Sequence, residues 1–132
     1  MSSKKQKETK KMSFKRFLNS IKYSIEGLAH AYKNEQSLWL HAMCTVLAII
    51  LGVILRISFI QWTIILIALV VVLAVELLNT AIEATVDLIT EDIHPLAKVA
   101  KDCGSAAAFV SSIVALIISL FIFIPKVILI FG

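Results

Sequence analysis

Residues 59–89 read FIQWTIILIALVVVLAVELLNTAIEATVDLI, a stretch that is apolar up to Val75 and becomes acidic after it. The apolar positions keep a helical period through both halves. A helix of this length exceeds the ~20 residues that cross the ~30 Å hydrocarbon core of a bilayer. The stretch therefore predicts a membrane-spanning helix that Trp62 anchors at one interface and that carries polar groups toward its far end.

Four polar residues share one face of this predicted helix: Glu76, Asn79, Glu83 and Asp87. At about 100° per residue, Asn79, Glu83 and Asp87 lie roughly 60°, 20° and 20° around the helix axis from Glu76. At ~1.5 Å per residue, Glu76 is ~26 Å along the helix from Phe59. Carboxylates near the inner edge of a bilayer cost roughly a few kcal/mol each unless they are compensated. Pairing with Lys or Arg of neighbouring helices and binding of a cation both remain open. Hard carboxylate oxygens suit Mg²⁺, and a carboxylate near lipid headgroups is placed to accept a proton from a hydroxyl.

Two further apolar stretches complete the predicted membrane domain, which covers residues 13–132. They run from about 39 to 57 and from about 104 to 124, and polar residues 90–102 precede the second of them. The chain of 132 residues is 59% hydrophobic and 17% charged, which is too apolar for a soluble domain of this length. The sequence therefore predicts an all-α integral membrane protein with three transmembrane helices.

The N-terminal region is basic, because nine of the 13 Lys and Arg residues precede residue 40. Residues 1–12 are predicted to be disordered, and apolar positions at helical spacing predict an amphipathic surface helix over residues 13–35. Packing of this helix against the protein's own core is the alternative to a position in the membrane interface. Basic segments on a membrane domain more often set topology and attract anionic lipid than bind nucleic acid, so no nucleic-acid partner is expected. The positive-inside rule places the N-terminus and the 90–102 loop in the cytoplasm.

Other polar residues on the same predicted side are less specific. Lys101-Asp102 precedes the third span, where a salt bridge between the two is the alternative to a functional role. His41, at the start of the first span, is most simply an interfacial residue. The sequence contains no Gly-rich phosphate loop of the Walker or protein-kinase type. The residues by themselves predict only a cytoplasm-facing site that can bind a cation.

Residues 76–87, ELLNTAIEATVD, resemble the diagnostic motif of the small prokaryotic diacylglycerol kinase family, E-x-[aliphatic]-N-[ST]-[AS]-[aliphatic]-E-x-x-V-D. The resemblance extends from about Phe14 to the third span and includes Asn34-Glu35 and the stretch AKDCGSAA at 100–107. Within the family, DLITEDIHPLAK at 87–98 and the tail FIPK resemble the Gram-positive branch, whose members are undecaprenol kinases.

The resemblance implies a homotrimer of three-span protomers in the bacterial inner (plasma) membrane, with cytoplasmic active sites shared between neighbouring subunits. The implied activity is ATP-dependent phosphorylation of the hydroxyl of a membrane lipid alcohol. Undecaprenol is the favoured acceptor, giving undecaprenyl phosphate, and diacylglycerol is the second, giving phosphatidic acid. The implied cofactor is Mg²⁺, with ATP as phosphoryl donor.

The resemblance also implies roles for individual residues. Glu76 is the general base that removes the proton from the lipid hydroxyl, Asn79 orients this carboxylate, and Asp87 supports the site. Ser105 lies near the lipid headgroup. Glu35 and Glu83 hold Mg²⁺ and so also bind ATP. The other implied ATP contacts are Arg16, Tyr23, Asp92, Ile93, His94, Lys101 and Asp102.

A small ion-coupled transporter or channel subunit is the main alternative function, because intramembrane acids often mark ion paths. Against it, the acids cluster toward one membrane edge, and the outer half of the second span contains none. A non-catalytic membrane scaffold is a third possibility, but it leaves the polar face unexplained.

Overall fold

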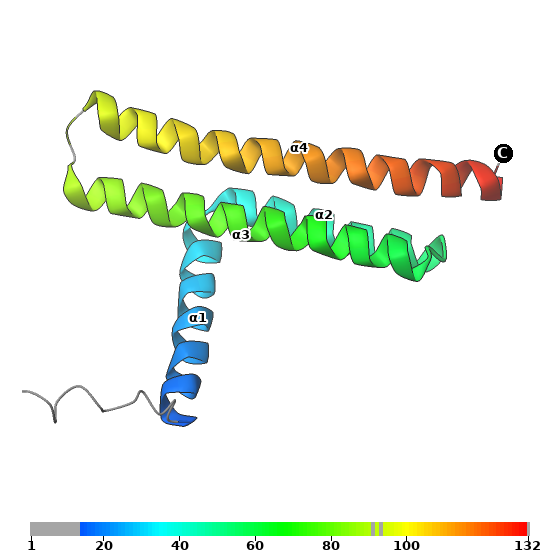
Figure 1. Cartoon of the computed structure of the whole chain (residues 1–132), viewed down its shortest axis with the longest axis horizontal. Helices are drawn as coiled ribbons and strands as arrows, with labels where there is room; N and C mark the ends of the chain where they lie inside the picture. The colour runs from blue at the N-terminus through cyan, green and yellow to red at the C-terminus, as the bar shows by residue number, and fades with distance from the viewer. Residues whose placement is uncertain (1–13, 91, 93, 132) are drawn as a thin grey trace, which may run out of the picture. The chain divides into compact units, whose positions relative to one another are not determined.

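The computed structural model describes residues 14–90, 92 and 94–131. These residues form four helices, α1 (Phe14–Asn34), α2 (Gln36–Ile54), α3 (Phe59–Ile89) and α4 (Pro95–Phe131), and no strand occurs among them (Figure 1). The chain divides into two units, Met1–Asn34 and Glu35–Gly132, of which the second contains α2, α3 and α4. The predicted all-α class is therefore confirmed. The predicted disorder of residues 1–12 lies outside the described residues.

The first unit contains α1, an amphipathic helix with a surface ion pair between Lys22 and Glu26 at 3.7 Å. Asn34 ends the helix, and its side-chain amide donates a 2.8 Å hydrogen bond to the backbone carbonyl of His30. This bond adds a second donor to a carbonyl of the last helical turn and fixes the Asn34 side chain at the end of α1. Glu35 follows in an extended conformation, with φ −108° and ψ 113°, and separates α1 from α2.

A tight turn joins α2 to α3, so α2 ends earlier than the apolar stretch predicted at 39–57. The N–H of Ile57 donates to the carbonyl of Gly52 at 3.1 Å, and Arg56 between the helices has a left-handed φ of 49°. This is the geometry of a Schellman motif, with arginine where glycine is usual. Ser58 and Gln61 then form a capping box that starts α3.

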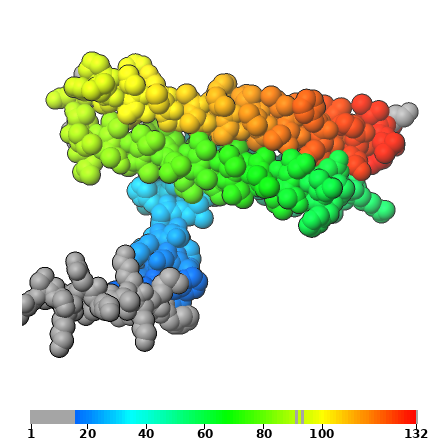
Figure 2. Space-filling model, in the orientation of Figure 1, coloured from blue at the N-terminus to red at the C-terminus, as the bar shows by residue number. Residues whose placement is uncertain are grey.

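The helices α2, α3 and α4 pack together, and α3 and α4 run side by side with their side chains in contact (Figures 1 and 2). Their buried apolar core lies toward the α2–α3 turn and contains Ala48, Leu55, Ile57, Ile65, Ile122 and Phe123. Most other large apolar side chains point outward. All three helices are long and apolar enough to cross a bilayer. In a bilayer, outward apolar side chains are expected because they face the lipid chains.

The helix α4 covers much more than the apolar stretch predicted at 104–124. It begins at Pro95, so the polar residues 95–102, which the sequence suggested as a connection, are helical. Proline suits the first helical position because its missing N–H would have no partner there. Lys98 and Asp102, one turn apart, form an ion pair on the surface of this first segment. Pro125 lies inside the helix and removes one backbone hydrogen bond without ending it.

Candidate active site

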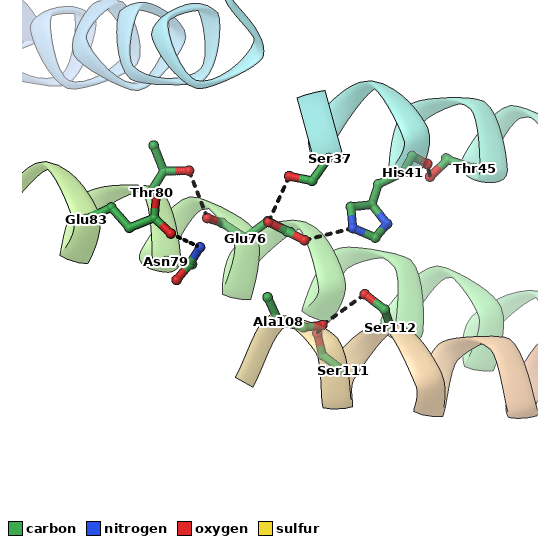
Figure 3. Close-up of polar contacts among 10 residues, drawn as sticks. All are labelled: Ser37, His41, Thr45, Glu76, Asn79, Thr80, Glu83, Ala108, Ser111 and Ser112. Carbon is green, nitrogen blue, oxygen red and sulfur yellow. Dashed lines mark hydrogen bonds and ion pairs between the residues drawn. The ribbon is translucent and has the colours of Figure 1, made fainter. Parts of the chain in front are cut away.

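Glu76 is the only buried polar or charged residue among those that the structure describes, with 7% of its surface exposed. Its Oε1 lies 2.8 Å from Nε2 of His41, and its Oε2 accepts a hydrogen bond from the hydroxyl of Ser37 at 3.2 Å (Figure 3). Both partners come from the first two turns of α2. The packing of α2 on α3 therefore supplies the hydrogen bonds that a buried carboxylate requires.

Sequence reasoning missed Ser37 and His41. The partner that the sequence left open for the Glu76 carboxylate was a Lys or Arg side chain. The structure instead provides the imidazole of His41 and the hydroxyl of Ser37. The ring of His41 also points at Glu76, which gives it a more specific position than the interfacial one predicted. The spacing of Ser37 and His41 could have pointed to a shared contact, because two polar residues four apart lie on one face of a mostly apolar helix.

Asn79 and Glu83 form a second polar contact one turn along α3. The amide of Asn79 donates a 3.0 Å hydrogen bond to Oε1 of Glu83, so in this chain Asn79 contacts Glu83 and not Glu76 (Figure 3). The side-chain oxygen Oδ1 of Asn79 is buried and has no hydrogen-bond partner within the described residues. Gly104 of α4 packs against this oxygen, and a Cβ at residue 104 would collide with it.

One ion pair connects the C-terminal part of the polar face to α4, and a second lies within α4. Lys101 pairs with Asp87 of α3, and Lys98 pairs with Asp102. The salt bridge between Lys101 and Asp102, which the sequence left open, is not formed. Adjacent residues on a helix point about 100° apart, whereas Lys98 and Asp102 share a face and Lys101 faces α3.

A pocket of about 270 Å³ lies where α3 ends and α4 begins. Its lining is formed by Val86, Asp87, Thr90, Asp92, His94, Ala97, Lys98, Lys101 and Asp102. A second, mostly apolar pocket of about 330 Å³ shares Val86, Thr90, His94 and Ala97 with it. Polar and apolar binding surfaces are thus adjacent, which suits a ligand that has a charged part and a flat apolar part.

The pocket brings together four of the predicted nucleotide contacts, namely Asp92, His94, Lys101 and Asp102. The fifth predicted contact of this segment, Ile93, lies outside the described residues. In the first unit, Arg16 and Tyr23 are both exposed on α1. Ser105 is exposed on α4, next to Gly104.

Glu35 is half-buried at the N-terminus of α2, and its side chain makes no capping hydrogen bond. Ser37, two residues later, contacts Glu76, so Glu35 lies at the same end of α2 as the buried carboxylate. Because α2 and α3 run in opposite directions, this end faces the part of α3 that leads from Glu76 to Glu83 (Figure 1).

Residues 22–123 match the family model described as prokaryotic diacylglycerol kinase. The chain belongs to this family. It is 40% identical to the undecaprenol kinase of Bacillus subtilis over 111 residues, which cover 84% of this chain and 90% of the relative. It is also 40% identical to a diacylglycerol kinase of Pseudomonas aeruginosa over 97 residues, 74% of this chain and 79% of the relative. The diacylglycerol kinase of Escherichia coli K12 is 36% identical over 104 residues, which cover 79% of this chain and 85% of the relative.

These matches confirm the family that residues 76–87 indicated. The chain is a lipid kinase of a prokaryotic membrane family, and the transporter alternative finds no support. Membership of a kinase family implies ATP as the phosphoryl donor and a lipid as the substrate. The buried Glu76 carboxylate and the first of the two pockets, called the charged pocket below, are therefore the candidate active site of a membrane-embedded kinase.

The described residues contain no group of three or more His, Cys, Asp or Glu side chains that could hold a metal ion by themselves. They do offer hard oxygen donors, namely the carboxylates of Glu83 and Glu35. Mg²⁺ usually binds one or two carboxylates together with substrate phosphates. This donor set therefore fits a magnesium ion that binds with a nucleotide.

Proposed function

We propose that this kinase transfers the γ-phosphoryl group of ATP to the hydroxyl of a membrane lipid alcohol, with undecaprenol as the favoured acceptor and diacylglycerol as the second. The observation that carries the proposal is the buried Glu76 carboxylate, which lies on the same helix as the wall of a charged pocket. The preference for undecaprenol rests on the Bacillus subtilis relative and on the segments at 87–98 and 123–126, which resemble the Gram-positive branch.

Glu76 acts as the general base in this proposal. An ionised carboxylate has about four lone-pair sites, and Ser37 and His41 occupy two of them, so Glu76 can still accept a hydrogen bond from the lipid hydroxyl. As the lipid oxygen forms its bond to the γ-phosphorus, the hydroxyl proton passes to Glu76. The bond between the γ-phosphorus and the β,γ-bridging oxygen breaks, and ADP leaves.

The charged pocket holds the nucleotide. Asp87 fixes the ammonium group of Lys101 at the pocket wall, where it can neutralise phosphate charge. Asp102 helps to seat the nucleotide, and Asp92, Ile93 and His94 border the adenine, which fits the neighbouring apolar pocket. By the family resemblance, Arg16 and Tyr23 of α1 add further contacts to ATP.

Glu83 and Glu35 hold Mg²⁺ in this account. When bound, the ion would offset the negative charge of the ATP phosphates. Asn79 fixes Glu83 through the 3.0 Å hydrogen bond, and it therefore acts on the metal-binding carboxylate more directly than on the base. Ser105, on the exposed side of α4, contacts the lipid headgroup.

The proposed assembly is a homotrimer in the bacterial plasma membrane, with the N-terminus and the active sites on the cytoplasmic side. The distribution of Lys and Arg supports this orientation. The large outward apolar surface of α2, α3 and α4 supports contacts with both lipid and neighbouring subunits. The 90–102 segment then meets ATP from the cytosol, while the lipid reaches Glu76 laterally.

The test is transfer of label from γ-labelled ATP by the purified full chain in detergent with Mg²⁺. C55 alcohol and diacylglycerol are compared as acceptors at equal mole fraction, and a reaction without acceptor is the background. We expect label in both lipids and a higher kcat/KM with the C55 alcohol. Label in neither lipid would refute the kinase proposal, whereas a preference for diacylglycerol would refute only the choice of acceptor.

A further inference from the structure

The imidazole of His41 has one hydrogen-bond partner among the described residues, and that partner is Glu76. Its side chain is 21% exposed, and its Nε2 lies 2.8 Å from Oε1 of the carboxylate. The imidazole is therefore not engaged in capping a helix or in bonding another polar side chain. The contact with Glu76 accounts for its placement in the second turn of an apolar helix.

We infer that His41 is a positioning residue for the base: its Nε2–H fixes the Glu76 carboxylate in the orientation in which the carboxylate receives the acceptor proton. The inference rests on the proposed role of Glu76 and adds a residue to it. An ionised carboxylate only accepts hydrogen bonds, so Nε2 must carry the hydrogen of the ring. A donor to a charged group forms the stronger kind of hydrogen bond, and its distance here is short enough for one.

The two donors to Glu76 differ in geometry. Ser37 lies at 3.2 Å from Oε2, a longer contact than the 2.8 Å from His41 to Oε1. His41 is thus the main group that fixes the carboxylate, and Oε2 is the oxygen more available to a lipid hydroxyl. The arrangement also differs from a nucleophilic triad, because the Ser37 hydroxyl bonds to the carboxylate and not to the imidazole.

This contact also explains how Glu76 stays available as a base. The carboxylate is buried and has no Lys or Arg within ion-pairing distance among the described residues. Hydrogen bonds from α2 compensate its charge without a cation. Glu76 can therefore remain a proton acceptor while Glu83, further along α3, is left to bind the metal.

The test compares His41→Leu, His41→Gln and His41→Asn in the full chain, with kcat and KM measured for both ATP and C55 alcohol. Leucine removes the donor, glutamine places an amide N–H at a reach similar to that of Nε2, and asparagine is one methylene shorter. We expect kcat to fall about 10- to 100-fold in His41→Leu, because a hydrogen bond to a charged group is lost, with the KM for ATP nearly unchanged. We expect His41→Gln to retain most of the parent kcat and His41→Asn to lose it.

Thr45→Val is the matched control on α2. Thr45 lies one turn further along, and its hydroxyl bonds only to the backbone carbonyl of His41 (Figure 3). This variant should keep the parent kcat. A second readout is the double variant of His41→Leu with Glu76→Gln, in which the leucine should cause no further loss because His41 acts through Glu76.

Parent-like kcat in His41→Leu would overturn the inference and leave the base assignment intact. A folded His41→Gln variant that is as slow as His41→Leu would also overturn it, because positioning needs only a donor at that reach. If the leucine variant does not assemble, the difference between His41→Gln and His41→Asn decides the question in the same way. Absence of lipid phosphorylation by the parent chain would instead refute the proposed function.

Discussion

Gly104 on α4 lies directly against the side-chain oxygen of Asn79 on α3, and Asn79 in turn holds Glu83. A Cβ at residue 104 would collide with Oδ1 of Asn79, so the two helices approach this closely only because residue 104 has no side chain. The spacing between α3 and α4 thus controls the position of a proposed metal-binding carboxylate through a single amide.

We therefore predict that Gly104→Ala reduces kcat/KM for Mg-ATP about 10-fold or more, because a misplaced catalytic group is costly to phosphoryl transfer. The measurement is steady-state kinetics in detergent together with gel filtration to check the assembly. Gly27→Ala is the control, since a Cβ at residue 27 meets no atom of the described residues within 4 Å. Equal kinetics in the two variants would contradict a functional role for the close approach of Gly104 to Asn79.

The metal assignment predicts a change in the dependence of rate on Mg²⁺. Glu83→Ala and Glu35→Ala each remove a carboxylate, so the Mg²⁺ concentration for half-maximal rate should rise about 10-fold or more. The measurement is a titration of Mg²⁺ at saturating ATP. Glu26→Ala on α1 is a control, because its carboxylate is exposed and its one ion pair among the described residues is with Lys22. A metal dependence equal to that of the parent would remove the substituted residue from the proposed ligand set.

The two lysines of the charged pocket should differ in their effects. Lys101 is 38% exposed and is held by Asp87, whereas Lys98 is 72% exposed and pairs along the surface of α4. We expect Lys101→Met to lower kcat/KM for ATP about 100-fold and Lys98→Met to lower it about threefold or less, because exposed charge pairs contribute little. Equal losses in the two variants would contradict the assignment of phosphate binding to Lys101.

Much of the central helix could be predicted from sequence, because helical periodicity specifies which residues share a face. The polar face of α3 and the all-α class follow from that pattern alone. Periodicity does not say which neighbouring helix covers a given residue. The contact of Glu76 with His41 and the pairing of Lys101 with Asp87 depend on how α2 and α4 pack on α3. The first was missed for this reason, whereas pairing of an acid with a Lys or Arg of a neighbouring helix was left open without naming the partner.

The start of α4 could not be predicted from composition. Residues 95–102 begin with proline and include the charged Lys98, Lys101 and Asp102, which together suggest a connection. Proline is nevertheless well suited to the first turn of a helix, and the pair of Lys98 and Asp102 is compatible with helical spacing. The lining of the charged pocket results from this helical start, because it turns Lys101 toward α3.

The rate of lipid phosphorylation by Glu76→Gln is the most direct test of the base. Glutamine keeps the size of the side chain; its carbonyl can accept the hydrogen bond from His41 and its amide N–H can donate to the hydroxyl oxygen of Ser37, so the helices should remain packed. The variant should run as the same assembly as the parent on gel filtration, and its kcat with C55 alcohol should fall by at least ~100-fold because proton abstraction is lost. A folded variant with near-parent turnover would contradict the account, because the proton would then leave the lipid hydroxyl without this carboxylate.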